Sequence, residues 1–159
     1  MAKPRQLELA NWGIGFYLST LGYHSHVDWA ERLAPLGLDA RQAAILLHIA
    51  QAGVQPQQAF ATALRIPPSR VVSLVDDLEA RQLITRRTTA ADRRVRTLHL
   101  TSRGRTMVRT LVDLEAAHER ALSVGLDHRE REQLVRLLRK AAAGLGLGTV
   151  HSGIDAPDW

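Results

Sequence analysis

The stretch that decides the fold runs from Pro68 to Ala80 and reads Pro-Ser-Arg-Val-Val-Ser-Leu-Val-Asp-Asp-Leu-Glu-Ala. Its apolar residues recur at the three- and four-residue steps that place side chains on one face of an α-helix. The pair Pro67-Pro68 favours a helix start, because the first turn needs no amide hydrogen from proline. We therefore predict an amphipathic helix with one buried and one outward face. The buried face contains Val71, Leu74, Val75 and Leu78, and the outward face contains Ser69, Arg70, Val72, Ser73, Asp76 and Asp77.

Two further helices are predicted before this stretch. Asp39 is a typical N-cap, and Gln42 three residues later completes a capping-box pattern, so one helix begins there and ends at Gly53. Pro56 suits the first position of a short helix that ends near Leu64. Helix, short helix, turn and helix is the order of a helix-turn-helix, whose second helix enters the major groove of DNA.

The residues after the stretch change to a strand pattern. Residues 83–88 and 95–100 alternate or are rich in β-branched side chains, and polar residues 89–94 separate them. This pattern predicts a β-hairpin with an arginine-rich tip. A hairpin here is the wing of a winged helix-turn-helix, and it can reach the minor groove or neighbouring phosphates. The predicted fold class is mainly α with a small β-hairpin wing.

Helical patterns on both sides predict a helical dimerisation region. One pattern covers residues 7–33 and ends at Pro35 and Gly37; Thr101 caps a second over 102–124, and Asp127 with Glu130 caps a third. Their apolar stripes exceed what one small winged domain can cover, which predicts an obligate homodimer. The predicted division is an N-terminal dimerisation helix (1–38), the winged helix-turn-helix domain (39–100), C-terminal dimerisation helices (101–145) and a flexible tail (146–159).

The positive charge is concentrated in one segment. The whole chain has a formal charge of +5, but residues 81–109 contain nine arginines and one acid, Asp92, so this segment carries +8 and the remainder −3. Arginine's planar fork suits phosphate oxygens and guanine edges better than lysine's point charge. A solvated surface would normally mix both signs, so the segment predicts a surface that binds double-stranded DNA.

Composition and motifs exclude several other classes. The 159 residues contain no cysteine, which excludes disulfide frameworks, thiolate metal clusters and thiol redox sensors. No apolar run approaches the roughly 20 residues that span a bilayer, and no signal segment follows the first residues, so we expect a cytoplasmic protein. Aromatic residues amount to 4%, too few for stacking on single strands. Without a nucleophile elbow, a phosphate-binding glycine loop or a triad spacing, we expect neither an enzyme nor a cofactor.

Residues 68–87, followed by Ala91-Asp-Arg-Arg-Val-Arg-Thr-Leu-His-Leu-Thr-Ser-Arg-Gly104, resemble the MarR family of bacterial transcriptional regulators. The resemblance extends from about Leu38 to Leu111. It implies a homodimer that binds a pseudo-palindromic operator, usually as a repressor. It also implies release from DNA when a small amphipathic or phenolic ligand binds between the dimerisation and DNA-binding parts.

The resemblance also assigns roles to individual residues. The family's wing signature Asp-x-Arg falls on Asp92 and Arg94, with Arg93 between them: the arginine enters the minor groove, and the aspartate orients it. The chain departs from many family members at Val72 and Ser73, where Thr and Arg are common. The predicted DNA-contacting residues are Ser69, Arg70, Val72, Ser73, Arg86, Asp92, Arg93 and Arg94.

Other side chains suggest two ligand sites. Trp12 and Phe16 are one helical turn apart, and either cement a dimer or line an effector pocket; the predicted effector-binding residues are Trp12, Phe16, Leu47 and His48, with ordinary packing as the alternative. His24, Asp28 and His118 raise the alternative of a zinc-responsive regulator. However, His118 lies on an apolar stripe, which favours a hydrogen-bonded core or interface histidine, and we predict no metal site.

A competing interpretation is a weakly specific architectural DNA-binding protein, or a regulator without a ligand. It is favoured by the single cation, Arg70, on the outward face of the helix over 68–80, beside an arginine-dominated wing. Such a protein would gain affinity mainly from the phosphate backbone and little from base edges.

Overall fold

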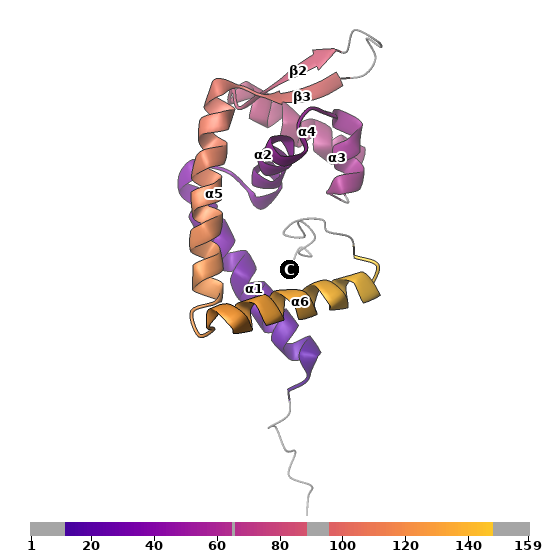
Figure 1. Ribbon diagram of the computed structural model, residues 1–159. Helices are drawn as coiled ribbons and strands as arrows, with labels where there is room; N and C mark the ends of the chain where they lie inside the picture. The colour runs from indigo at the N-terminus through magenta and orange to yellow at the C-terminus, as the bar shows by residue number, and fades with distance from the viewer. Residues whose placement is uncertain (1–11, 65, 89–95, 148–159) are drawn as a thin grey trace, which may run out of the picture.

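The computed structural model describes residues 12–64, 66–88 and 96–147. In these ranges the chain forms six α-helices and a three-stranded antiparallel sheet, which confirms the predicted fold class. The helices are α1 (Ile14–Leu33), α2 (Ala40–Ala52), α3 (Gln57–Ala63), α4 (Pro68–Ala80), α5 (Ser102–Leu122) and α6 (His128–Gly144), with a short 3-10 turn η1 (Ala34–Leu36) after α1. The strands are β1 (Gln55–Pro56), β2 (Ile84–Thr88) and β3 (Arg96–Leu100). The hairpin strands and α6 lie at opposite ends of the molecule (Figure 1).

Local signals start α2, α5 and α6 as predicted, whereas α1 begins at Ile14 and not near Leu7 as its pattern predicts. Asp39 and Gln42 form the capping box of α2: the Gln42 amide donates to Asp39 Oδ1 at 2.7 Å, and the Asp39 amide donates to Gln42 Oε1 at 3.0 Å. Asp127 and Glu130 form the equivalent box on α6, and the Thr101 side chain caps α5. Gly37 takes the left-handed conformation that ends η1, with φ of 62°.

The start of α3 differs from the prediction. Pro56 is not the first helical residue but pairs with Thr97 in the two-residue strand β1, and α3 begins at Gln57. The sheet order is β1-β3-β2, so the wing hairpin gains a third strand. The two residues of β1 are too few to show a strand pattern in the sequence. They are a strand because they pair with the edge of β3.

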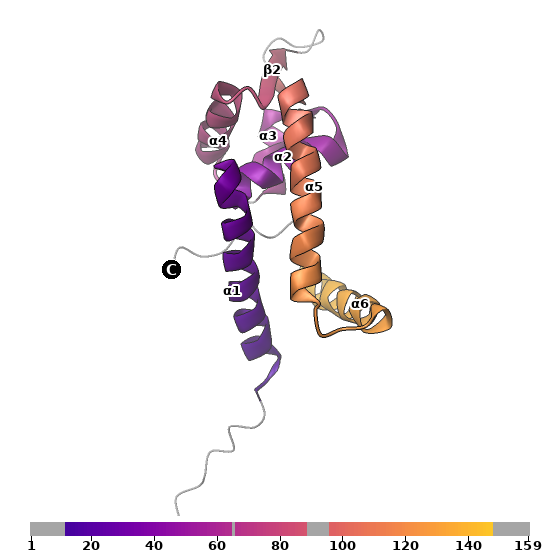
Figure 2. The same cartoon turned by 90° about the vertical axis from the view of Figure 1, so that its left-hand side faces the viewer.

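One hydrophobic core lies in the winged part of the chain. It includes Phe60 from α3, Leu98 from β3 and the predicted stripe of α4, of which Val71, Leu74, Val75 and Leu78 are all buried. By contrast, α1 contributes only Leu33 and α5 only Leu111 among the large buried apolar side chains, and α6 buries none of its residues. Most residues of α1, α5 and α6 therefore lie outside this core, and Figure 2 shows how far these helices extend from the winged part.

The N-terminus of α5 closely approaches Leu83, which lies in the turn between α4 and β2. Gly104 is buried, and a Cβ atom there would lie 1.9 Å from the carbonyl oxygen of Leu83. The same oxygen accepts hydrogen bonds from the Thr101 amide at 3.1 Å and the Thr101 hydroxyl at 3.3 Å. Only glycine fits at this position, so Gly104 fixes where α5 leaves the winged domain.

None of the helices in the described ranges is both long and apolar enough to cross a bilayer.

Candidate nucleic-acid interface

The second helix of the helix-turn-helix, α4, presents the outward face that the sequence predicts. Ser69, Arg70, Val72 and Ser73 are exposed along its N-terminal half. The side chain of Val72 is 44% exposed although it is apolar, which suits contact with a thymine methyl group better than packing within one chain. The N-terminal half of this helix therefore offers one cation, two hydroxyls and one apolar group.

The described arginines from Arg70 to Arg96 fall into two groups. Arg70, Arg87 and Arg96 are exposed and take part in no ion pair with a described residue. Arg81 instead donates to the carbonyl oxygens of Leu36 and Gly37, both at 2.7 Å, and so fastens the end of α4 to the turn after α1. A count of charges in the sequence cannot separate the two groups, because the partners of each arginine depend on which residues lie nearby in the fold.

Arg86 belongs to the group held within the fold. Its side chain is only 14% exposed, and its guanidinium contacts Asp76 at 2.5 Å and Glu79 at 2.6 Å. Its Nε donates to Gln57 Oε1 at 3.0 Å. These partners occupy three of the five N–H donors of a guanidinium that is mostly buried, and two of the partners are carboxylates, so the geometry argues against the phosphate contact predicted for Arg86.

The predicted wing-tip residues Asp92, Arg93 and Arg94 lie outside the described residues. The base of the wing is described: β2 and β3 pair in register from Ile84↔Leu100 to Thr88↔Arg96. Arg87 and Arg96 are exposed near its open end. The described base of the wing therefore carries exposed positive charge on both of its strands.

A second side-chain contact, between Gln42 and Asp77, joins α4 to α2. Gln42, whose backbone and side chain complete the capping box of α2, also donates its amide to Asp77 Oδ2. Gln42 is buried, although its pattern in the sequence indicates only a helix cap. Gln42, Gln57 and Glu79 are thus site residues that the sequence analysis missed, and no local signal identifies them.

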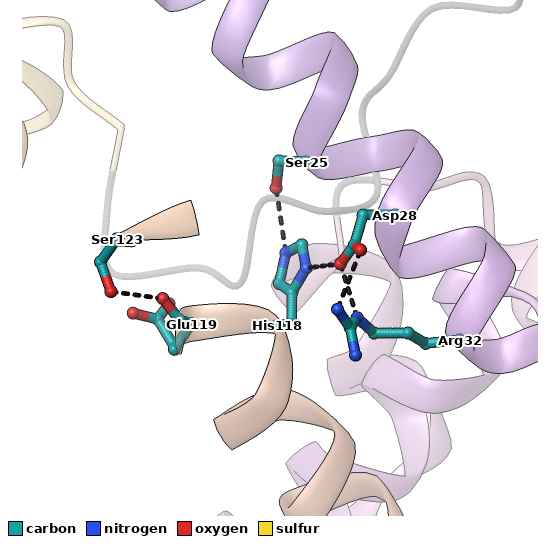
Figure 3. A network of polar contacts seen from close by, with 6 residues as sticks. All are labelled: Ser25, Asp28, Arg32, His118, Glu119 and Ser123. Atoms are coloured by element: carbon teal, nitrogen blue, oxygen red, sulfur yellow. Dashed lines mark hydrogen bonds and ion pairs between the residues drawn. The ribbon is translucent and has the colours of Figure 1, made fainter. Parts of the chain in front are cut away.

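Asp28 and His118, two of the three side chains that raised the zinc alternative, take part in a hydrogen-bonded network between α1 and α5 (Figure 3), and His24 does not. His118 Nδ1 lies 2.6 Å from Asp28 Oδ2, and Arg32 donates to both oxygens of Asp28 at 2.6 and 2.9 Å. The hydrogen bond from Arg32, followed by that from His118, lowers the pKa of Asp28 from 3.8 to about 2. Among the described residues, no three His, Asp or Glu side chains gather as metal ligands would.

The same network includes Ser25, whose Oγ lies 3.1 Å from His118 Nε2. Ser25, His118 and Asp28 thus follow the order of a hydrolase triad, which their spacing in the sequence does not predict. However, Ser25 lies inside α1, where backbone amides donate to carbonyl oxygens one turn earlier. The helix therefore has no free amide pair beside Ser25 to stabilise an oxyanion. The network joins α1 to α5.

The four predicted effector residues separate into two pairs. Trp12 and Phe16 stack at 4.1 Å between ring centroids, and both are exposed. Leu47 is buried, and the His48 ring meets the edge of Phe60 at 5.2 Å. Figure 2 shows that α2 lies beside the C-terminal end of α1. The length of α1 therefore separates the two pairs, and the helix rises by about 25 Å from Phe16 to Leu33. One subunit does not bring all four together.

Comparison with known proteins shows which family and which solved structures this chain resembles. Residues 36–95 match the family model of the MarR family. CouR from Rhodococcus jostii RHA1, whose structure holds p-coumaroyl-CoA, is 27% identical, with a TM-score of 0.72 over 92% of this chain and 98% of that one. BpsR from Bordetella bronchiseptica, regulated by 6-hydroxynicotinic acid, is 24% identical, with a TM-score of 0.72 over 88% and 98%. A variant of MarR from E. coli, complexed with operator DNA, is 21% identical, with a TM-score of 0.71 over 80% and 92%.

Proposed function

We propose that the chain is a MarR-family transcriptional regulator, a homodimeric repressor that binds a pseudo-palindromic operator and is released by a small-molecule ligand. The main observation that supports DNA binding is the exposed N-terminal half of α4 beside an arginine-rich wing. A recognition helix meets base edges with that half, and a wing reaches neighbouring phosphates or the minor groove.

We propose that Ser69, Arg70, Val72 and Ser73 read base edges or bind phosphates from α4. Arg70 has no ion-pair partner among the described residues, so its guanidinium is available for guanine or phosphate. Asp92, Arg93 and Arg94 form the wing contact in this proposal, and the exposed Arg87 replaces Arg86 as the phosphate contact on β2.

The homodimer is supported by apolar side chains that one chain leaves uncovered. The exposed members on α1 include Phe16, Tyr17, Leu18 and Leu21, and those on α6 include Leu134, Val135, Leu137 and Leu138. Soluble monomers rarely expose an apolar surface of this extent, so a second copy that covers α1 and α6 is the natural partner. Sedimentation at micromolar concentration should give about twice the monomer mass.

Ligand release is supported by the relatives. CouR was solved with p-coumaroyl-CoA, and the DNA binding of BpsR is regulated by 6-hydroxynicotinic acid. Both molecules contain an aromatic ring with an acid-derived group, so we propose that this chain also takes a small aromatic acid or its thioester. Trp12, Phe16, Leu47 and His48 remain the candidate residues. Because one subunit separates the two pairs, a pocket that used all four would need α1 from the second subunit.

Selection from a pool of random-sequence duplexes tests the DNA-binding proposal. The wild-type protein should enrich an inverted repeat, and its affinity for this operator should exceed that for scrambled DNA by about 10³ or more. A ratio near one with a steep salt dependence would support the architectural interpretation instead. Arg94→Ala should weaken operator binding by about 1 to 3 kcal/mol without lowering the melting temperature, because a wing-tip side chain adds little to the core.

A further inference from the structure

We propose that Glu79 is a positioning residue for DNA binding: through Arg86 it fixes the wing in one orientation relative to the recognition helix α4. This inference rests on the proposed function, in which α4 and the wing contact DNA. It adds a residue that itself touches no DNA and that has the same charge as DNA.

The first contact satisfies an open edge of the sheet. In the order β1-β3-β2, strand β2 lies at the edge and pairs only with β3. An amide of β2 that points away from β3 therefore has no strand partner. The Arg86 amide is in this position, and it donates to Glu79 Oε1 at 2.8 Å. A helix side chain thus takes the place of a fourth strand and fastens β2 to α4.

The second contact uses the other oxygen of the same carboxylate. Arg86 Nη1 donates to Glu79 Oε2 at 2.6 Å, so Glu79 holds both the backbone and the side chain of one residue. The guanidinium also reaches Asp76 on α4 and Gln57 on α3. Four hydrogen bonds therefore join β2 to both helices of the helix-turn-helix. We call Glu79, Arg86, Asp76 and Gln57 the wing clamp.

The wing clamp differs from an ordinary surface ion pair. An exposed pair contributes little, since water solvates both partners and the long side chains lose freedom. Here the Arg86 side chain is 14% exposed, and the carboxylate of Glu79 spans two donors whose relative position is fixed by the strand. Such bidentate, partly buried contacts define one geometry. Without Glu79, the edge amide and one end of the guanidinium lose their partner.

A fixed wing matters because two elements must reach the same duplex. When α4 enters the major groove, a rigid connection presents the wing at a high effective concentration, and a loose connection lowers it without removing any DNA contact. Plain electrostatics gives the opposite expectation, because removing an acid beside DNA raises the positive charge and strengthens binding. The sign of the effect therefore separates positioning from charge.

The experiment compares Glu79→Ala with Glu79→Gln on the full-length chain, using the operator selected by the wild-type protein. Both variants change the net charge equally, but glutamine retains an oxygen that can accept from the Arg86 amide. We expect Glu79→Ala to bind operator about tenfold more weakly, which corresponds to about 1.4 kcal/mol, and Glu79→Gln to lose less. Asp113→Ala is the matched control: it removes an exposed acid from α5 and should leave operator binding unchanged or tighter.

A second measurement separates positioning from a merely structural role. Arg94→Ala should weaken the wild-type protein more than it weakens the Glu79→Ala protein, because a loosened wing already contributes less. Strictly additive losses, or unchanged or tighter operator binding by Glu79→Ala, would overturn the proposal.

Hydrogen exchange in the free protein tests the clamp without DNA. The Arg86 amide should exchange faster in Glu79→Ala than in wild type, and Glu79→Gln should lie between them. If the amide exchanges at the same rate in all three proteins, the clamp does not form. If the wild type enriches no sequence from the pool, the proposed function fails, and the exchange rates still decide whether Glu79 holds β2.

Discussion

Gly104→Ala tests how closely the first turn of α5 approaches Leu83, in the turn between α4 and β2. The added Cβ would lie 1.9 Å from the Leu83 oxygen, whereas ordinary contact begins at 3.4 Å, so one backbone must move by about 1.5 Å. That movement disturbs two hydrogen bonds from Thr101 to the same oxygen. Overpacking costs about 1 to 3 kcal/mol and each weakened hydrogen bond about 1 kcal/mol, while alanine in a helix returns about 1 kcal/mol. We expect a net loss of about 3 kcal/mol.

Urea unfolding at one fixed protein concentration measures this loss, since the stability of the proposed homodimer would depend on concentration. The melting temperature should fall by about 6 to 12 °C for a chain of this size. Gly144→Ala is the control, because Gly144 is also helical but its Cβ would meet nothing within 4 Å. That variant should be neutral or stabilised by up to about 1 kcal/mol. If Gly104→Ala were as stable as Gly144→Ala, α5 would not approach Leu83 as described.

Three further variants test the helix cap, the α1–α5 network and the recognition helix. Asp39→Ala removes the capping box of α2 and should lower the free energy of unfolding by about 1 kcal/mol in urea, whereas an unchanged midpoint would contradict the cap. Because the folded pKa of Asp28 is about 2 against an ordinary 3.8, its contribution is present above pH 3.8 and is lost as the pH falls toward 2. Asp28→Asn should therefore flatten the decline in stability over that interval, and an unaltered acid profile would show that the carboxylate contributes nothing. Arg70→Ala should weaken operator binding by about 1 to 3 kcal/mol and scrambled DNA much less; equal losses would mean that Arg70 holds only phosphate.

Part of the candidate site could be predicted from the sequence. The outward position of Ser69, Arg70, Val72 and Ser73 follows from the stripe Val71, Leu74, Val75 and Leu78, because a helix with one buried face must turn the other outward. The role of the arginines could not be predicted in this way. Arg70 and Arg86 are equivalent in a count of charge, but one is exposed and the other meets three side chains from α3 and α4.

The sequence by itself determined the features whose partners lie within a few residues along the chain. Asp39 with Gln42 and Asp127 with Glu130 cap their helices wherever the helices lie, since the two partners of each box are only three positions apart in the chain. Only the tertiary structure decided the strand pairing of Pro56, the network of His118 with Asp28, and the contacts of Glu79 with Arg86. Each of these joins residues on different elements, and sequence periodicity reports the face of an element but not the neighbour against which that face packs.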